Sequence, residues 1–363
     1  MRTLKQRMLL AMSDKMEIGS FFELADPSII STEENFVSRQ FSDSLWTSSG
    51  RDSFMALAKN FDQKKTLHVP HYYCHLTLEI IKRHFNVKRY EDLPTENFPR
   101  FDTIKAKAGD LVLAVNFFGS RNAETWKSFA NENPSLTIVE DHSHAPFSEW
   151  AKQGCAEFSL ASLRKSFPLP CGGYLKGKAL KHLAAPAGGE HEANEIRAQY
   201  LKTLHAAGAK MHSKFFVDLF MKVEAHYNAN NTLTLMSDTA KAVLFHLDIE
   251  KMQMLRDKNF IVLSDFIGAS NLAYAFINRN AADKFSRFNP TFVLENSESR
   301  EALRKHLHAN KIYPTVLWEM EKYNASEEAC ELSRRIITIP LDFRCSACEC
   351  EFVGNILKHF RVK

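Results

Sequence analysis

Three apolar runs without polar alternation lie in the first half of the chain. They are "TLHVP" (66–70), "DLVLAVNFFG" (110–119) and "SLTIVEDHSHA" (135–145), and helix-like stretches separate them, "LTLEIIKRHF" (76–85) and "ETWKSFANEN" (124–133). Strands that are covered on both faces are apolar throughout. Strands that alternate with helices form parallel sheets through right-handed crossovers. The pattern therefore predicts an α/β fold with a mostly parallel central sheet flanked by helices.

The second half of the chain has a different pattern. Residues 191–260 are mostly helical, and a new unit begins after "NPTFVLEN" (289–296). This unit holds two helix-like stretches, "SREALRKHLHANKI" and "CEFVGNILKHF", with the strand-like "IITIPLDF" between them. We therefore expect a large domain of residues 1–249 and a smaller α+β C-terminal domain of residues 250–363, a division that suits the chain length.

Composition places the chain among ordinary globular proteins. Of its 363 residues, 45% are hydrophobic and 25% are charged, and the net charge is +4. Both fractions are typical of globular domains. Basic residues are interleaved with acidic ones, so the charge pattern does not indicate a nucleic-acid partner.

The N-terminal stretch "MRTLKQRMLLAMSDKMEIGS" is basic with a short apolar patch. Asp14 and Lys15 end that patch, which makes it too short for the core of a signal peptide. No run reaches the roughly 18 apolar residues of a membrane helix. The seven cysteines are an odd number, which favours free thiols over a disulfide framework. These features predict a cytoplasmic protein without a membrane partner.

Polar or reactive side chains lie at the ends of three of the predicted strands. The first leads into "HYYCH", the second ends at Asn116, and the third ends at Asp141. Lys165 comes 24 residues after Asp141 (165 − 141), inside "ASLRKSFPLPCGGY" (161–174). Because functional groups of open parallel sheets gather at the carboxyl ends of the strands, we expect these residues to share one site.

Pyridoxal 5'-phosphate (PLP) chemistry requires residues of these types. It needs a lysine that forms a Schiff base, a carboxylate facing the pyridine nitrogen, and a phosphate cradle at a helix N-terminus. Lys165, Asp141 and the polar start of "TSSGRDSFMALAKNF" (47–61) supply these parts. Each part alone has a structural reading: a basic surface turn for Lys165, a turn or cap for Asp141, and an ordinary helix cap for "SSGRDS".

The order of these motifs resembles that of fold type I PLP enzymes, and among them the DegT/DnrJ/EryC1/StrS (sugar) aminotransferases. The family order runs through a phosphate loop, Pro-x-x-x-aromatic, a strand end, Glu-Asp-x-x-Gln/His, Ser…Lys and Gly-Gly. This chain has "SSGRDS", "PHYYC", "NFFG", "EDHSHA", "SLRK" and "CGG" in the same order. The resemblance covers residues 15 to 360, and it is most specific at "EDHSHA" and "SLRKSFPLPCGG".

The resemblance implies a role for each matching residue. Lys165 would be the Schiff-base lysine and proton shuttle, Asp141 the partner of the pyridine nitrogen, and His144 the neighbour of the ring hydroxyl. Gly50 and Arg51 would give backbone N–H groups to the phosphate, helped by Ser49, and Ser162 would add a hydroxyl. The fold implied is that of aspartate aminotransferase-like PLP-dependent transferases.

Three positions depart from the family pattern. The ring-stacking aromatic aligns with Cys74, next to Tyr73, and the strand-end histidine is Asn116. The serine expected five residues before the lysine is Leu160. Either Ser159 or Ser162 then has to bind the phosphate. These differences indicate a divergent branch.

Two other features have candidate chemistry. "RCSACEC" (344–350) contains Cys345, Cys348 and Cys350, but a closed zinc site needs four ligands and only His359 offers a fourth, so we predict no metal. Arg344 is a candidate for binding a substrate carboxylate. We interpret His68, His71, His75 and His84 as ordinary surface or cavity residues, with His75 the best of them for the active site.

The sequence thus predicts an aminotransferase that uses PLP, an amino-acid donor such as glutamate, and a keto or aldehyde acceptor. The family resemblance adds a nucleotide-linked keto-sugar as a possible acceptor, and a homodimer with sites at the interface. Two alternatives stay open: another PLP-dependent reaction, such as decarboxylation or carbon–sulfur chemistry, and a non-catalytic protein that retains the fold.

Overall fold

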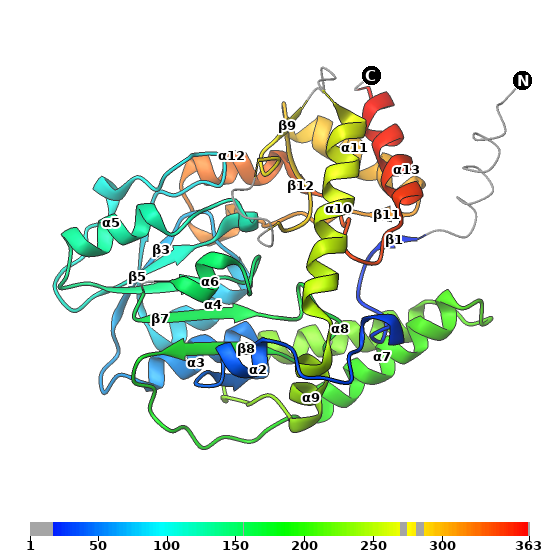
Figure 1. Ribbon diagram of the computed structural model, residues 1–363. Helices are drawn as coiled ribbons and strands as arrows, with labels where there is room; N and C mark the ends of the chain where they lie inside the picture. Colours follow the sequence, from blue (N-terminus) through cyan, green and yellow to red (C-terminus); the bar gives the residue numbers. More distant parts are fainter. Residues whose placement is uncertain (1–16, 155, 269–273, 281–286, 362–363) are drawn as a thin grey trace, which may run out of the picture.

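A computed structural model describes residues 17–361 except 155, 269–273 and 281–286. The apolar patch of the N-terminal stretch lies outside the described residues. The elements form a large α/β part and a smaller part beside it (Figure 1). No helix in the described ranges combines the length and the apolar character needed to cross a membrane.

The large part is built on a seven-stranded sheet with the order β2-β8-β7-β6-β5-β3-β4. The pairs from β4 to β7 are parallel, whereas β8 pairs antiparallel with both β7 and β2. The strands are β2 (Leu45–Thr47), β3 (Thr66–Pro70), β4 (Asn86–Tyr90), β5 (Leu111–Val115), β6 (Thr137–Asp141), β7 (Phe158–Ser162) and β8 (Gly173–Gly177). The predicted mostly parallel central sheet is confirmed.

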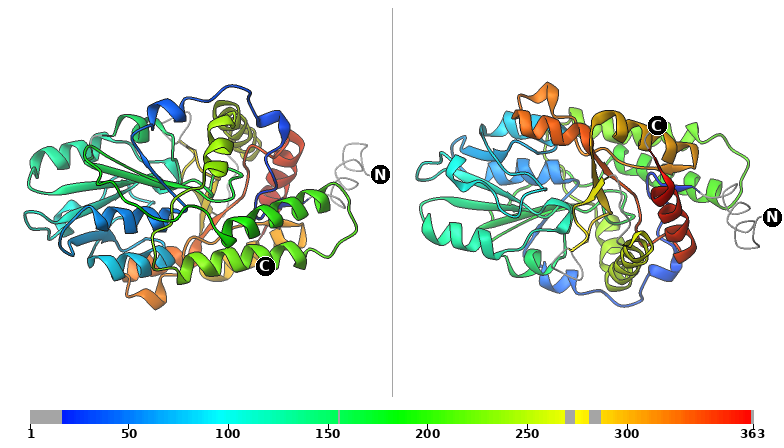
Figure 2. Two further views of the ribbon diagram at one scale, coloured as in Figure 1. Left: turned by 90° about the horizontal axis from the view of Figure 1, so that it is seen from below. Right: turned by 90° about the horizontal axis from the view of Figure 1, so that it is seen from above.

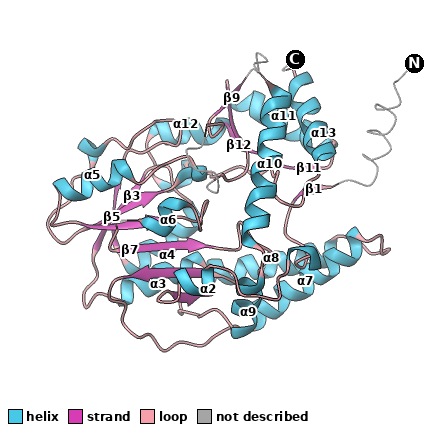
Figure 3. Cartoon of the chain, viewed as in Figure 1, coloured by secondary structure: helices cyan, strands magenta, loops and turns pink. Residues whose placement is uncertain are grey.

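Helices cover both faces of this sheet, as Figure 3 shows. Leu111 and Leu113 of β5 join a core that includes α3 (Gly50–Lys59) and α4 (His75–His84). Val112 points to the other face, toward α5 and α6. Both faces are therefore buried, which is why the strand runs are apolar without alternation. The remaining helices of the large part are α2 (Val37–Gln40), α5 (Glu124–Glu132), α6 (Glu149–Gln153), α7 (Glu190–Ala206), α8 (Lys214–Ala229) and α9 (Asp238–His246).

The helical stretch expected over residues 191–260 contains α7, α8, α9 and most of α10 (Ile249–Ile267). Helices α7 and α8 form a hairpin, and the break between them contains Gly208 at a φ of +95° (Figure 2). Glycine adopts this left-handed backbone without the steric cost that a Cβ atom adds.

The smaller part contains a three-stranded antiparallel sheet with the order β12-β10-β9. A two-residue strand near the N-terminus, β1 (Ile18–Gly19), pairs with β11 of this part, so the chain crosses between the parts twice. The division predicted at residue 249/250 falls at the first residue of α10 and stays a prediction. The elements are α10 (Ile249–Ile267), β9 (Tyr274–Phe276), β10 (Thr291–Leu294), α11 (Ser297–Ala309), β11 (Ile312–Tyr313), α12 (Glu327–Arg335), β12 (Ile336–Thr338) and α13 (Ala347–His359).

Candidate active site

One cavity of about 600 Å³ lies at the carboxyl ends of the parallel strands. Both parts of the chain line it, together with the segment that follows β1. It collects all ten of the residues proposed from the sequence: Ser49, Gly50, Arg51, Tyr73, Cys74, Asn116, Asp141, His144, Ser162 and Lys165. Their individual roles stay predictions, but their convergence on one site is a property of the fold.

The sheet explains this convergence. Asp141 is the last residue of β6, Asn116 directly follows β5, and Ser162 ends β7 with Lys165 three residues later. The Asn116 N–H donates to the Asp141 carbonyl over 3.0 Å, which joins two of the strand ends. Neighbouring parallel strands end at the same edge, so residues distant in sequence meet there.

The Asp141 carboxylate is held by two donors. The Ser143 N–H donates to Oδ1 over 2.8 Å, and the Tyr73 hydroxyl donates to Oδ2 over 2.5 Å. Burial, together with the negative charge of Asp141, raises the pKa of Tyr73 well above its ordinary value. Tyr73 therefore keeps its proton and remains the donor. Of the two candidates for ring stacking, Tyr73 is thus tied to Asp141, while Cys74 has no such bond among the described contacts.

His144 is held as a neutral ring. The Phe118 N–H donates to its Nδ1 over 3.1 Å, so the ring proton is on Nε2. The imidazole stacks on Phe118, Phe288 and Trp318, and burial together with the nearby Lys165 lowers its pKa well below the ordinary value. His144 therefore offers a hydrogen-bond donor, and no positive charge, at neutral pH.

Lys165 is exposed on the cavity wall. Its Nζ lies 5.6 Å from the centre of the Trp318 ring, and no ion pair with a carboxylate is found for it among the described residues. A contact of this kind with an aromatic face is worth only about 0.5–1 kcal/mol at an exposed position. The amine is therefore restrained but available to react.

The start of α3 closes one end of the cavity. Ser49 caps the helix by accepting the Asp52 N–H over 3.2 Å, and a Cβ atom on Gly50 would lie 3.0 Å from the Ser162 Cβ. Glycine thus lets the helix N-terminus reach the end of β7. Of the two serines considered for the phosphate, Ser162 lines the cavity and Ser159 does not.

Sequence reasoning missed several residues of the cavity wall. Trp318 and Phe288 come from the smaller part, and Phe21 and Phe22 come from the segment after β1. The hairpin adds Glu195 and Glu224, which pair with Arg164 at 3.1 Å each. No local sequence signal marked these residues, because they reach the site through long-range packing.

Arg344 also lines the cavity, but it is already paired. Its guanidinium lies 2.8 Å from both Asp342 and Glu23. Burial would lower its pKa, but the two carboxylates outweigh burial and raise the pKa above its ordinary value. A substrate carboxylate would therefore have to displace one of these partners.

Other candidates from the sequence lie away from the cavity. His75 stacks on Tyr323 and does not line it. Cys345 is half-buried, Cys348 is exposed and Cys350 is buried. Within the described ranges, no group of three or more His, Cys, Asp or Glu side chains is arranged to hold a metal ion.

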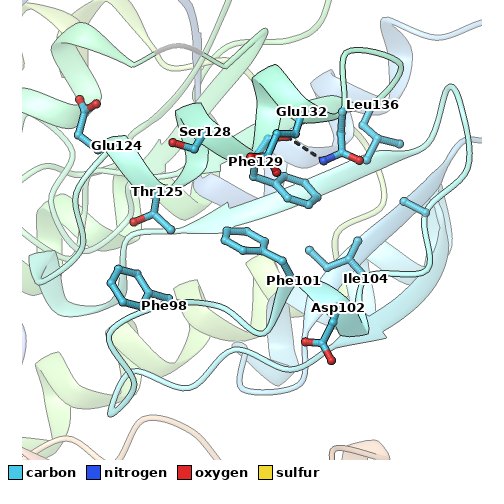
Figure 4. A pocket seen from close by; sticks show the side chains of 12 residues that line it. Phe98, Phe101, Asp102, Ile104, Glu124, Thr125, Ser128, Phe129, Glu132 and Leu136 are labelled. Carbon is cyan, nitrogen blue, oxygen red and sulfur yellow. Dashed lines mark hydrogen bonds between the residues drawn. The ribbon is translucent and has the colours of Figure 1, made fainter.

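A second cavity, of about 700 Å³, lies beside α5 (Figure 4). The stacked rings of Phe101 and Phe129 contribute to its lining, and Glu124 and Asp102 add acidic groups. None of the ten predicted residues lines it, and it contains no lysine, histidine or cysteine. Of these two cavities, the first is therefore the one with the candidate chemistry.

Comparison with solved structures identifies the class of fold. The first is DesI, which was solved in the presence of its TDP-sugar product. The match covers 97% of this chain and 88% of DesI, at 14% sequence identity and a TM-score of 0.62. Spr1654 of Streptococcus pneumoniae, named as a sugar aminotransferase and solved in its PMP form, matches 99% of this chain with 96% of its own, at 12% identity and a TM-score of 0.63. Helicobacter pylori PseC, an aminotransferase of pseudoaminic acid biosynthesis, matches 99% with 98%, at 11% identity and a TM-score of 0.60.

The chain therefore has the fold of fold type I PLP-dependent transferases. Within that class it is similar in fold to the sugar aminotransferases, as the sequence motifs predicted. No family model matches the sequence, and no curated protein matches it. The low identities agree with the predicted divergence.

We predict a pH-dependent stability from Asp52, which lies buried behind the Ser49 cap. Burial raises the pKa of its carboxyl from 3.8 to about 6, although hydrogen bonds from the Ser49 hydroxyl and the Thr234 N–H oppose this. The folded state thus holds this proton more tightly than the unfolded state. The contribution of this proton to the free energy of unfolding is fully present below about pH 4 and is lost as the pH rises to about 6. Above that pH, Asp52 causes no further change.

Asp52→Asn should remove this dependence. Relative to the wild type, the free energy of unfolding of the variant should rise by on the order of 3 kcal/mol between about pH 4 and about pH 7. Urea unfolding of both proteins across this pH range measures the difference between their free energies of unfolding. The contributions of other titrating groups cancel in that difference. A difference that does not change with pH would contradict the prediction.

Proposed function

We propose that this protein is a PLP-dependent aminotransferase that moves an amino group from an amino-acid donor to a keto or aldehyde acceptor. The observation that carries the proposal is the meeting of Lys165 and Asp141, from the ends of adjacent strands, in one cavity with the N-terminus of α3. The fold supports the proposal because its structural neighbours are aminotransferases.

The residues of the cavity fit PLP. The Asn116 side chain is 1% exposed, and both of its polar atoms lack a hydrogen-bond partner among the described residues. Buried polar groups are normally satisfied, so a polar ligand at this position is expected. Gly50, next to Ser162, leaves an open backbone at the start of a ten-residue helix, which is where phosphate groups bind.

Each side chain has a task that its chemistry allows. Lys165 would bind the cofactor covalently through its amine and move the proton of the donor. Asp141 would hold a proton on the pyridine nitrogen, and the His144 Nε2–H would donate to the ring hydroxyl. Ser49, Gly50 and Ser162 would hold the phosphate. When bound, PLP supplies an electron sink for the bond that is broken at the donor.

For the substrates, glutamate is the donor that we propose to test first, and a nucleotide-linked keto-sugar is the first acceptor. The acceptor is suggested by the TDP-sugar product of DesI. The cavity extends beyond Lys165 to Tyr313 and Arg344 of the smaller part, which leaves room for an acceptor.

We also propose that the protein acts as a homodimer. Several large apolar side chains are exposed on the α7–α8 hairpin, and exposed apolar groups of this kind often mark contact surfaces. They are Ile196, Tyr200, Phe215 and Met221. Light scattering should give a mass of about twice 41.5 kDa. A mass equal to that of one chain at micromolar concentration would refute the dimer.

The covalent role of Lys165 can be tested directly. Protein loaded with PLP should absorb visible light, and borohydride reduction followed by peptide mapping should place the pyridoxyl group on Lys165. Lys165→Ala should lose both signals. A pyridoxyl group on Lys176 or Lys178 would show that the lysine is wrongly assigned. Keto-acid formation from glutamate then separates an aminotransferase from other PLP enzymes, and the absence of a visible band would favour a non-catalytic protein.

Asp141→Asn tests the second assignment. This substitution keeps the shape of the side chain but removes the charge that would hold the ring proton through a charge-assisted hydrogen bond. The variant should still bind PLP, because Lys165 and the phosphate site are intact. Its single-turnover reaction with the donor should slow by at least about a hundredfold, since about 1.4 kcal/mol of lost transition-state stabilisation is tenfold in rate. A near wild-type rate would mean that Asp141 is only a turn residue.

A further inference from the structure

Arg51 presents an unused cationic side chain to the end of the cavity where the phosphate is expected. It is the second residue of α3, its side chain is 13% exposed, and it lines the cavity. Its Nε is buried without a hydrogen-bond partner in the described part of the chain. Its ion pair with Glu224 spans 3.9 Å from Nη1 to Oε2, which is longer than a hydrogen bond. Within the described residues, the Arg51 guanidinium therefore has this long ion pair and no hydrogen bond.

Glu224 lies between two guanidinium groups. Its Oε1 accepts from Arg164 over 3.1 Å, and its Oε2 is the atom that faces Arg51. Arg164 is in turn bound by Glu195 over 3.1 Å and packs on the Tyr227 ring at 4.6 Å. Both Nη groups of Arg164 are thus paired with carboxylates, although its Nε, like that of Arg51, lacks a hydrogen-bond partner among the described residues. Arg51 has only the one long contact with Glu224, so it is the member of the cluster that remains free to bind another anion.

We infer that the Arg51 guanidinium binds the phosphate of the cofactor, and that Glu224 competes with that phosphate for Arg51. This inference rests on the proposed function, because it assumes that PLP binds at this cavity. Arginine matches phosphate geometry through parallel N–H donors, and charge-assisted bonds of this type are stronger than neutral ones. The adjacent Gly50 and Ser162 and the unsatisfied Asn116 independently indicate a polar ligand in this cavity.

The charges of the cluster give the two residues opposite effects. Arg51 and Arg164 balance Glu195 and Glu224 before a ligand is present. A phosphate monoester adds about −1.5 to −2 at neutral pH. It is attracted by Arg51 and repelled by Glu224. Removing the Arg51 charge should therefore weaken phosphate binding, whereas removing the Glu224 charge should strengthen it.

The experiment compares PLP with pyridoxal, which has the same ring and aldehyde but no phosphate. Cofactor-free full-length protein is titrated with each compound, and the visible absorbance of the Lys165 adduct gives the Kd. The variants are Arg51→Gln and Glu224→Gln. Arg39→Gln and Asp218→Asn are the matched controls, because Arg39 and Asp218 are exposed and lie outside the cavity. Circular dichroism checks that each variant is folded.

We expect Arg51→Gln to raise the Kd for PLP by about tenfold to a hundredfold, the usual effect of losing a hydrogen bond between charged groups. The Kd for pyridoxal should change by less than about twofold, because the contact is with the phosphate. Glu224→Gln should lower the Kd for PLP by about threefold to tenfold. Both controls should match the wild type.

Each other outcome has a definite meaning. If Arg51→Gln keeps the wild-type ratio of the two Kd values, the inference fails while the proposed function stands. If that variant binds PLP normally but its holoenzyme loses affinity for a nucleoside diphosphate, Arg51 serves the substrate and the inference also fails. If Glu224→Gln leaves the Kd for PLP unchanged, Glu224 does not compete with the phosphate for Arg51, and that half of the inference fails. If wild-type protein forms no adduct with either compound, the proposed function itself fails.

Discussion

The whole site depends on the close approach of one turn to two strand ends. A Cβ atom on Gly173 would lie 2.6 Å from the Ser49 carbonyl carbon, and the Gly172 N–H donates to the Ser48 carbonyl over 2.7 Å. The start of α3 is therefore pressed against β8 and the end of β7, where only glycine leaves enough space. This contact fixes the N-terminus of α3 beside Ser162, so that helix start and the loop that carries Lys165 (the lysine loop) share one wall of the cavity. The glycine pair after Lys165 is explained by this geometry.

Much of this arrangement could be predicted because its signals are local. The run "TLHVP" became β3 with the predicted bounds, since a strand buried on both faces has to be apolar throughout. The carboxyl ends of parallel strands form one edge, so the sequence alone predicts that Asn116 and Asp141 lie together. The helix cap at Ser49 follows from side-chain chemistry at a helix start.

The remainder of the site could not be predicted because it depends on packing between distant segments. Trp318 reaches the cavity from the smaller part, and Phe21 reaches it because β1 pairs with β11. The pairing of Arg164 with Glu195 and Glu224 required knowing that α7 and α8 fold back as a hairpin over the lysine loop. No periodicity in the sequence specifies such contacts. The two-helix break at Gly208 was likewise hidden within a continuous helical pattern.

Two arginines of the cavity wall are paired with carboxylates, whereas Lys165 is not paired with one among the described residues. Arg164 is paired with Glu195 and Glu224, and Arg344 is paired with carboxylates of its own, so these cations are structurally committed. Lys165 instead faces the Trp318 ring, and the neighbouring His144 is held neutral by burial. A cation that is paired with a buried carboxylate stabilises the structure around the cavity, because breaking the pair would leave an uncompensated buried charge. The fold therefore separates the cations that build the cavity from the amine that can react in it.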